Sequence, residues 1–434
     1  MVHQGLGGVW SSECGRSPLV RPENMVHQTI AIRTAKASSA SSKIRVMKFS
    51  FLLRALSLAI VGSLVACSSS PPVDLSPTTP ATPSITWSDS SDTEPLPPAV
   101  SQPKSRWVPV RWAELPGVEQ DAMHEAWNAF LKNCERPHPA FVALCSEVRR
   151  MSLAGEVDQK RWLRARLQPY RVEAHDGRAE GMLTSYYEPM LEARRLPTAE
   201  FNIPLYALPA GRTAKGGAWY TRQQIETLPA AQAALQGRAI AWLNDPVEAM
   251  VLHIQGSGRL TLTEPDGRVH QVRVAYAGTN EQPYRSIGKW LLDQGLVRDA
   301  TWPGIKAWIA QNPQRTQELM WSNPRYVFFR EEALEGVDIN FGPKGAQGVA
   351  LTPGRSIAVD RGSIPYGTPV WLHSSGPLVT LNRLVMAQDT GSAILGAVRA
   401  DYFMGWGHEA GEMAGRIKQN LRLWTLWPKG VPVH

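Results

Sequence analysis

The sequence predicts a mainly β fold with some helices. From about residue 181 onward, short apolar or alternating runs lie between turns rich in Gly, Pro and Asn. Such runs are typical of strands, and because they do not alternate with helices they favour barrel-like β structure. The expected strands cover 181–187, 239–243, 249–254, 269–276, 326–330, 356–359, 369–373 and 384–387. Roughly 330 residues follow the N-terminal segments, which is enough for two domains.

Helices are expected at only a few places. Met123, Trp127, Phe130 and Leu131 recur at spacings of three and four, which predicts a helix over 119–134 before the strand-rich part. The remaining expected helices cover 286–294, 302–311 and 408–419.

The N-terminal part predicts an exported lipoprotein. Residues 47–66 start with basic side chains, continue with an apolar run and end in small residues before Cys67, as a secretory signal does. The apolar run is about a dozen residues long, whereas a membrane-spanning helix needs roughly twenty. The letters LVAC at 64–67 resemble the lipobox of bacterial lipoproteins, which implies that Cys67 is lipidated and that the mature chain starts there. Ser68 after it favours the outer membrane, facing the periplasm.

Two segments flank this signal. Residues 1–46 are polar and patternless, and we interpret them as an over-extended start. Residues 67–105 are rich in Pro, Ser and Thr, with nine prolines and no Lys or Arg between 68 and 103. Such a composition buries too little apolar surface to offset the entropy of ordering, so we expect a tether between the lipid and the folded part.

Charge and cysteine content limit the possible functions. The residues before Cys67 carry +6 of the formal net charge of +8, which leaves +2 for the mature chain. This charge gives no support to nucleic-acid binding. Cys134 and Cys145 are the only pair of cysteines in the globular part; they can form one disulfide in an oxidising periplasm or stay as two buried thiols. No metal-binding, phosphate-binding or serine-hydrolase motif is present, so we expect no metal and no cofactor.

Three aspartates in the C-terminal part are the candidates for chemistry. Asp360, Asp389 and Asp401 each lie beside glycines or strand residues. Acids at strand ends can converge in a cleft, where burial or a second carboxylate raises a pKa and holds a proton for acid catalysis. Each can instead cap a turn. Residues 389–391 also read Asp-Thr-Gly, as in aspartic proteases, but the chain has one such tripeptide and would need a homodimer, whereas we expect a monomer.

Longer motifs carry a resemblance to a known family. Around the aspartates the chain reads IPYGT at 364–368 and DTGSAI at 389–394, which resembles the three-Asp module of bacterial cell-wall enzymes. Upstream it reads SYYEP at 185–189, WLNDPV at 242–247, LHIQGSGR at 252–259, YRSIG at 284–288 and NPRYVFF at 323–329. Together these motifs resemble the membrane-bound lytic murein transglycosylase A family over roughly 107–430. Ser185 and Arg325 depart from the family pattern.

The resemblance implies a fold and a site. It implies a double-psi β-barrel built from 106–187 and 322–434, a second β domain inserted over 188–321, and a groove for glycan between them. It also implies that Asp401 is the catalytic acid and base and that Asp389 is its close neighbour. The residues we expect to contact substrate are Thr184, Tyr186, Gln255, Gly256, Ser257, Tyr276, Ser286, Tyr326 and Asp360; the three tyrosines suit sugar stacking but can equally belong to the core.

The implied reaction is cleavage of the β-1,4 bond between N-acetylmuramic acid and N-acetylglucosamine in peptidoglycan without water, as in a lytic exotransglycosylase, a carbon–oxygen lyase. Two rival functions are a peptidoglycan-binding lipoprotein without catalysis and a hydrolase of another polysaccharide. The expected partners are glycan strands and the outer membrane and, by analogy with the family, penicillin-binding proteins or scaffold lipoproteins.

Overall fold

The computed structural model describes residues 95–214 and 216–433. The expected signal over 47–66, Cys67 and most of the expected tether lie outside these residues. Within the described ranges, no helix is long and apolar enough to cross a membrane.

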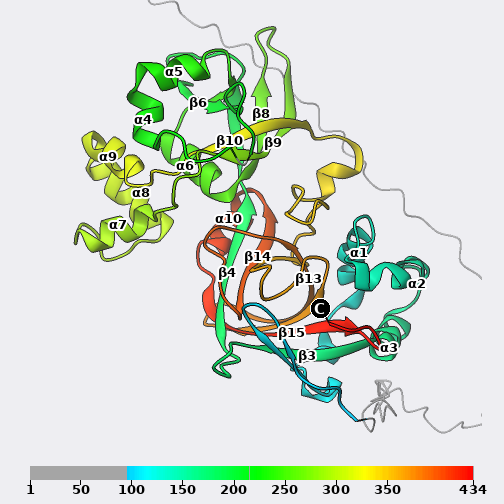
Figure 1. Cartoon of the computed structure of the whole chain (residues 1–434). Helices are drawn as coiled ribbons and strands as arrows, with labels where there is room; N and C mark the ends of the chain where they lie inside the picture. Colours follow the sequence, from blue (N-terminus) through cyan, green and yellow to red (C-terminus); the bar gives the residue numbers. More distant parts are fainter. Residues whose placement is uncertain (1–94, 215, 434) are drawn as a thin grey trace, which may run out of the picture. The chain divides into compact units, whose positions relative to one another are not determined.

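The first sheet has nine strands, and six of them close into a barrel (Figure 1). The strand order is β1-β2-β3-β15-β12-β13-β11-β14-β4, and β15 also pairs with β4, which closes the ring. Two neighbouring pairs, β11 with β13 and β14 with β4, are parallel. The bounds are β1 Val100–Ser101, β2 Arg106–Pro109, β3 Leu167–Glu173, β4 Gly181–Glu188, β11 Ser356–Val359, β12 Pro369–Ser375, β13 Thr380–Asp389, β14 Arg399–Trp406 and β15 Lys418–Pro428.

Apolar side chains fill this barrel. Ile357, Val359, Val370, Leu384 and Met386 are all fully buried. All four residues of β11 are buried, which explains why the apolar residues Ile357, Ala358 and Val359 follow one another instead of alternating with polar ones. The expected mainly β, barrel-like fold is confirmed.

Helix α10 (Gly407–Ala414) packs on β4 and β14, and a separate helical group lies beside the first sheet: α1 (Met123–Asn133), α2 (Cys145–Met151) and α3 (Glu156–Arg166). Trp127, Phe130 and Trp162 join α1 to α3 with ring centroids 5.7–5.9 Å apart. A disulfide between Cys134 and Cys145 links the end of α1 to the start of α2. The disulfide alternative is therefore the one that the structure shows.

The second sheet has the order β10-β9-β8-β5-β7-β6. Its strands are β5 Met190–Arg194, β6 Ile203–Tyr206, β7 Ala239–Leu243, β8 Ser257–Thr263, β9 Val269–Thr279 and β10 Val327–Ala333. The chain enters this sheet directly after β4 ends at Glu188. The return to the first sheet was expected at residue 322, but β10 pairs with β9 along its whole length, so the second sheet extends to Ala333.

Helices accompany the second sheet. They are α4 Arg222–Thr227, α5 Pro229–Leu235, α6 Pro246–Gln255, α7 Ile287–Asp293, α8 Trp302–Gln311 and α9 Thr316–Trp321. Met250 of α6 shares a core with Ile305 and Trp308 of α8 and Leu319 of α9. The expectation of few helices is therefore wrong for this part of the chain.

Three local expectations are wrong. The stretch 249–254 is part of helix α6 and not a strand, because the Asp245 side chain accepts a hydrogen bond from Val247 N and Pro246 occupies the first helical turn. The helix expected over 408–419 is α10, Gly407–Ala414, and β15 begins at Lys418. The tether ends before residue 105, because β1 already pairs with β2.

Candidate active site

The barrel places Asp389 and Asp401 on the two strands that flank β11. Asp389 ends β13, Asp401 lies in β14, and β11 runs between the two. Ala358 of β11 is the register partner of both aspartates. Because adjacent strands lie about 4.8 Å apart, the two aspartate backbones are separated by about 10 Å.

Thr184 and Arg399 hold the Asp401 carboxyl. Thr184, the register partner of Asp401 in β4, donates its hydroxyl proton to Asp401 Oδ1. Arg399 lies two residues before Asp401 on the same strand and therefore on the same face. Its Nη2 donates to Thr184 Oγ1 at 2.7 Å. Since the Thr184 oxygen accepts from Arg399, its own proton is free to point at Asp401.

Tyr186 and a backbone amide hold the Asp389 carboxyl. The Tyr186 hydroxyl donates to Asp389 Oδ2 at 2.9 Å, and Ala346 N donates to Asp389 Oδ1 at 3.0 Å. The Tyr186 ring packs against Phe403 of β14, with centroids 5.2 Å apart. Thr184 and Tyr186 alternate along β4 and so project from one face toward the two aspartates.

Burial raises the pKa of both carboxyls. Burial raises the pKa of Asp389 to about 6, and the charge of Asp401 adds to this, while hydrogen bonds from Thr390 N, Tyr186 and Ala346 N oppose it. Burial also raises the pKa of Asp401, against the Thr184 hydrogen bond and the Arg399 charge, which favour the carboxylate. The site can therefore hold a proton on a carboxyl at a pH where an exposed aspartate is fully ionised.

Two family models match this chain, one over the second sheet and one over the part that carries the aspartates. A family model described as "MltA specific insert domain" matches residues 182–330, and a "3D domain" model matches residues 355–427, which include all three aspartates. A membrane-bound lytic murein transglycosylase A of Vibrio cholerae is 31% identical over 282 residues, 62% of this chain and 71% of the relative. The chain belongs to the membrane-bound lytic murein transglycosylase A family.

Solved structures agree with this assignment. A lytic transglycosylase of Burkholderia pseudomallei is 43% identical, with a TM-score of 0.53, covering 77% of this chain and 98% of that one. The MltA structure from Neisseria gonorrhoeae in a monoclinic form is 31% identical, with a TM-score of 0.65, covering 78% and 97%. The two-domain fold of the family is thus the fold of this chain.

Gln255, Gly256 and Ser257 lie where α6 meets β4. Gln255 Oε1 accepts a hydrogen bond from Tyr187 N at 3.1 Å. Gly256 has a φ of +80°, which ends α6 and lets Ser257 start β8. The three residues therefore join the second sheet to the strand that carries Thr184 and Tyr186.

Other residues that were expected to contact substrate do not reach the aspartates. Tyr326 is 3% exposed and packs on His253 and Phe328 in the core beside the second sheet. Ser286 caps α7 by accepting from Lys289 N at 3.1 Å. Tyr276 is exposed in β9 beside Phe329 of β10. Tyr326 therefore belongs to the core beside the second sheet, whereas substrate contact by Ser286 and Tyr276 stays a prediction.

Asp360 has an internal role. It forms an ion pair with Lys104 Nζ at 2.9 Å and accepts from Gly362 N and Gly396 N at 3.0 and 2.9 Å. Burial would raise the pKa of Asp360, but these donors outweigh burial and lower it. Gly396 lies between Asp389 and Asp401, so Asp360 fixes the loop that joins them. These contacts engage both carboxylate oxygens of Asp360.

Sequence reasoning missed a buried charge cluster at the end of β4. Glu188 is fully buried; its Oε2 accepts from Arg259 Nε at 2.8 Å and its Oε1 from Arg273 Nε at 2.6 Å. Both arginines also donate to Phe341 O, and the Arg259 guanidinium lies 3.7 Å from the ring centroid of Trp406. The cluster joins β4 and β14 to β8 and β9. The sequence signalled this cluster only through one charged residue in each of two motifs, Glu188 in SYYEP and Arg259 in GSGR.

Replacing Glu188 with Gln should destabilise the protein strongly. The change leaves Arg259 and Arg273 buried without a counter-charge, and breaking a buried ion pair in this way costs about 3–5 kcal/mol. The free energy of unfolding from denaturant titration measures the loss. Glu192→Gln, at an exposed position of β5, is the matched control. Equal stability of the two variants would contradict the role assigned to the cluster.

Proposed function

We propose that this chain is a lytic murein transglycosylase that uses Asp401 as its only acid and base. The enzyme cleaves the β-1,4 bond between N-acetylmuramic acid and N-acetylglucosamine in peptidoglycan, for turnover and remodelling of the cell wall. Family membership supports the reaction. Burial of Asp401 favours the acid, whereas its Thr184 hydrogen bond and the Arg399 charge favour the carboxylate, and this balance supports the residue assignment.

The first step needs a protonated Asp401. The carboxylic acid gives its proton to the glycosidic oxygen, and the bond from that oxygen to the muramoyl C1 breaks with its electron pair on the leaving sugar. The substrate's own N-acetyl group can stabilise the resulting positive centre, so no protein nucleophile is required. Burial of Asp401 supports this step because it keeps a proton on the carboxyl.

The second step needs Asp401 as a carboxylate. It takes the proton of the muramoyl C6 hydroxyl, and the C6 oxygen bonds to C1 and closes the 1,6-anhydro ring. The proton lost in the first step is thereby regained, and no water is consumed. The Thr184 hydroxyl and the Arg399 charge stabilise the carboxylate between the two steps. Asp389 contributes charge to the site and anchors Tyr186.

The cell-envelope setting forms part of the proposal. The relatives are named as membrane-bound, which supports association of this chain with a membrane. We assign the anchor to a lipid on Cys67 and the location to the periplasmic face of the outer membrane. Glycan strands then lie within reach of the catalytic domains, in a groove between barrel and insert. Penicillin-binding proteins or scaffold lipoproteins are the partners that this setting favours.

Incubation with purified murein sacculi tests the reaction and the catalyst together. The protein should release 1,6-anhydromuropeptides, identified by mass, whereas Asp401→Asn should lower the rate by at least about 100-fold, as expected for loss of a general acid. Asp389→Asn is the comparison variant and should retain more activity. Reducing ends would indicate a hydrolase instead. Binding to sacculi without any cleavage would indicate a glycan-binding lipoprotein.

Replacing Arg399 with Gln should shift the pH dependence of the reaction. Activity falls as the pH rises through the pKa of Asp401, because the acid loses its proton. Removal of the Arg399 charge raises that pKa, so the alkaline limb of the kcat profile should move up by about one pH unit. Arg399→Lys keeps the charge and should restore most of the wild-type profile. An alkaline limb at the same pH in wild type and Arg399→Gln would rule out an effect of the Arg399 charge on the pKa of Asp401.

A further inference from the structure

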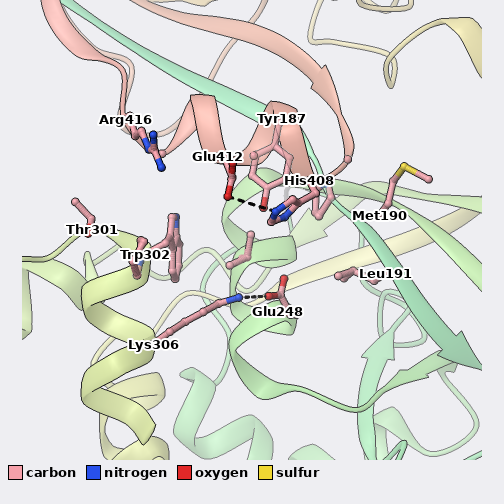
Figure 2. Close-up of a pocket in the computed structure, with 16 residues that line it drawn as sticks. Tyr187, Met190, Leu191, Glu248, Thr301, Trp302, Lys306, His408, Glu412 and Arg416 are labelled. Carbon is pink, nitrogen blue, oxygen red and sulfur yellow. Dashed lines mark hydrogen bonds and ion pairs between the residues drawn. The ribbon is translucent and has the colours of Figure 1, made fainter. Parts of the chain in front are cut away.

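A cavity lies on the face of β4 that points away from Asp401. It has a volume of about 520 Å³ and is formed by the junction of β4 and β5 with α6, α8 and α10 (Figure 2). Tyr187 lines it, whereas the preceding Tyr186 binds Asp389. Because successive strand residues point to opposite faces, this cavity is separate from the aspartate site although both are built on one strand.

Close packing shapes the walls of the cavity. The Tyr187 ring lies over Gly411 of α10 so closely that a Cβ at residue 411 would be 2.7 Å from the ring. Trp302 extends from α8 toward Gly415 at the end of α10, and Met190 and Val251 add apolar surface. A cavity of this size with aromatic and aliphatic walls is typical of sites for small ligands.

The polar groups around the cavity carry charges of both signs. Lys306 of α8 forms an ion pair with Glu248 of α6, and His408 Nε2 lies 3.3 Å from Glu412 Oε1 on α10. Arg416 extends into the cavity from beyond α10 (Figure 2). Lys306, His408 and Glu412 are exposed and Glu248 is part-exposed; such pairs contribute little to stability, so their members can exchange partners with a ligand at low cost.

The charges discriminate between the two parts of peptidoglycan. The glycan backbone offers hydroxyl and acetamido groups but no net charge, because the lactyl carboxyl of each muramoyl sugar is joined to a peptide by an amide bond. The attached stem peptide carries free carboxylates together with an ammonium group, and alanine methyl groups between them. We propose that this cavity binds the stem peptide of the substrate, an inference that rests on the proposed function.

Each part of the cavity has a counterpart in such a peptide. Arg416 and Lys306 receive carboxylates, and Glu248 and Glu412 receive the ammonium group. Trp302, Tyr187 and the aliphatic side chains cover the methyl groups. The enzyme would then recognise glycan at the aspartates and peptide on the reverse side of the same strand, which favours strands that still carry their peptides.

A comparison of two substrates tests whether the enzyme prefers glycan strands that carry their peptides. Initial rates are measured on peptide-bearing glycan strands and on the same strands after an amidase has removed the peptides. For Arg416→Gln and Trp302→Ala, the ratio of kcat/KM between the two substrates should fall by about 5- to 10-fold, as expected for loss of one charged or aromatic contact. Arg422→Gln, an exposed arginine of β15 that pairs with Glu180, is the control and should keep the wild-type ratio. An unchanged ratio in the cavity variants would overturn the proposal.

A binding measurement tests the peptide site independently of catalysis. The tetrapeptide L-Ala-D-Glu-meso-diaminopimelate-D-Ala is titrated by calorimetry into the full-length Asp401→Asn protein. Saturable binding, weakened at least about fivefold when Arg416→Gln or Trp302→Ala is added, is expected. Absence of binding, or binding that the added changes leave intact, would refute the peptide site. If the wild type releases no anhydro ends while this binding is present, the proposed reaction fails and the peptide site stands.

Discussion

Strand β4 sets the geometry on which the rest of the site depends. One face carries Thr184 toward Asp401, Tyr186 toward Asp389 and Glu188 toward the arginines of the second sheet. The opposite face packs on α10, where Ser185 donates to Ala414 O and Tyr187 covers Gly411. Because strand side chains alternate strictly, a shift of one residue would reverse both sets at once. The pairing of β4 with both β14 and β15 prevents such a shift.

Opposed influences act on the pKa of the Asp401 carboxyl. A group that serves as acid and then as base must be able to hold a proton and release it within one turnover. Burial favours the protonated Asp401, whereas the Thr184 hydroxyl and the Arg399 charge favour the carboxylate. Neither influence alone suits both steps. The two together place the pKa between that of an exposed aspartate and that of an unassisted buried one.

Local sequence predicted some elements well because the hydrophobic pattern and the flanking turn residues agreed there. Strand β11 is short and largely apolar, the run 181–187 in β4 is short and mixes apolar with polar residues, and both were expected because turn residues bound them. Helix α6 was mistaken for a strand because Val247, Met250, Val251 and Leu252 are buried around the helix, which removes the amphipathic period. The Asp-Pro pair at 245–246 was a usable start signal.

Contacts between distant segments could not be read from single motifs. The three aspartates were found from their glycine-rich surroundings, yet the internal role of Asp360 depends on Lys104, 256 residues away. Arg399 was overlooked although its two-residue spacing from Asp401 on a strand predicts a shared face. Tyr326 was expected at the substrate because its motif is distinctive, but it is part of the core that the second domain needs to fold.

Side chains of β4 and β14 set the protonation of the two part-buried aspartates. A ¹³C NMR titration of the aspartate carboxyl carbons, assigned with the Asp389→Asn and Asp401→Asn variants, measures this protonation directly. Both carboxyls should titrate above the ordinary value of 3.8, with the pKa of Asp389 at about 6, and Thr184→Val should raise the pKa of Asp401 further. Titration of both groups at the ordinary value, or an Asp401 pKa that does not respond to Thr184→Val, would contradict this effect of the β4 and β14 side chains.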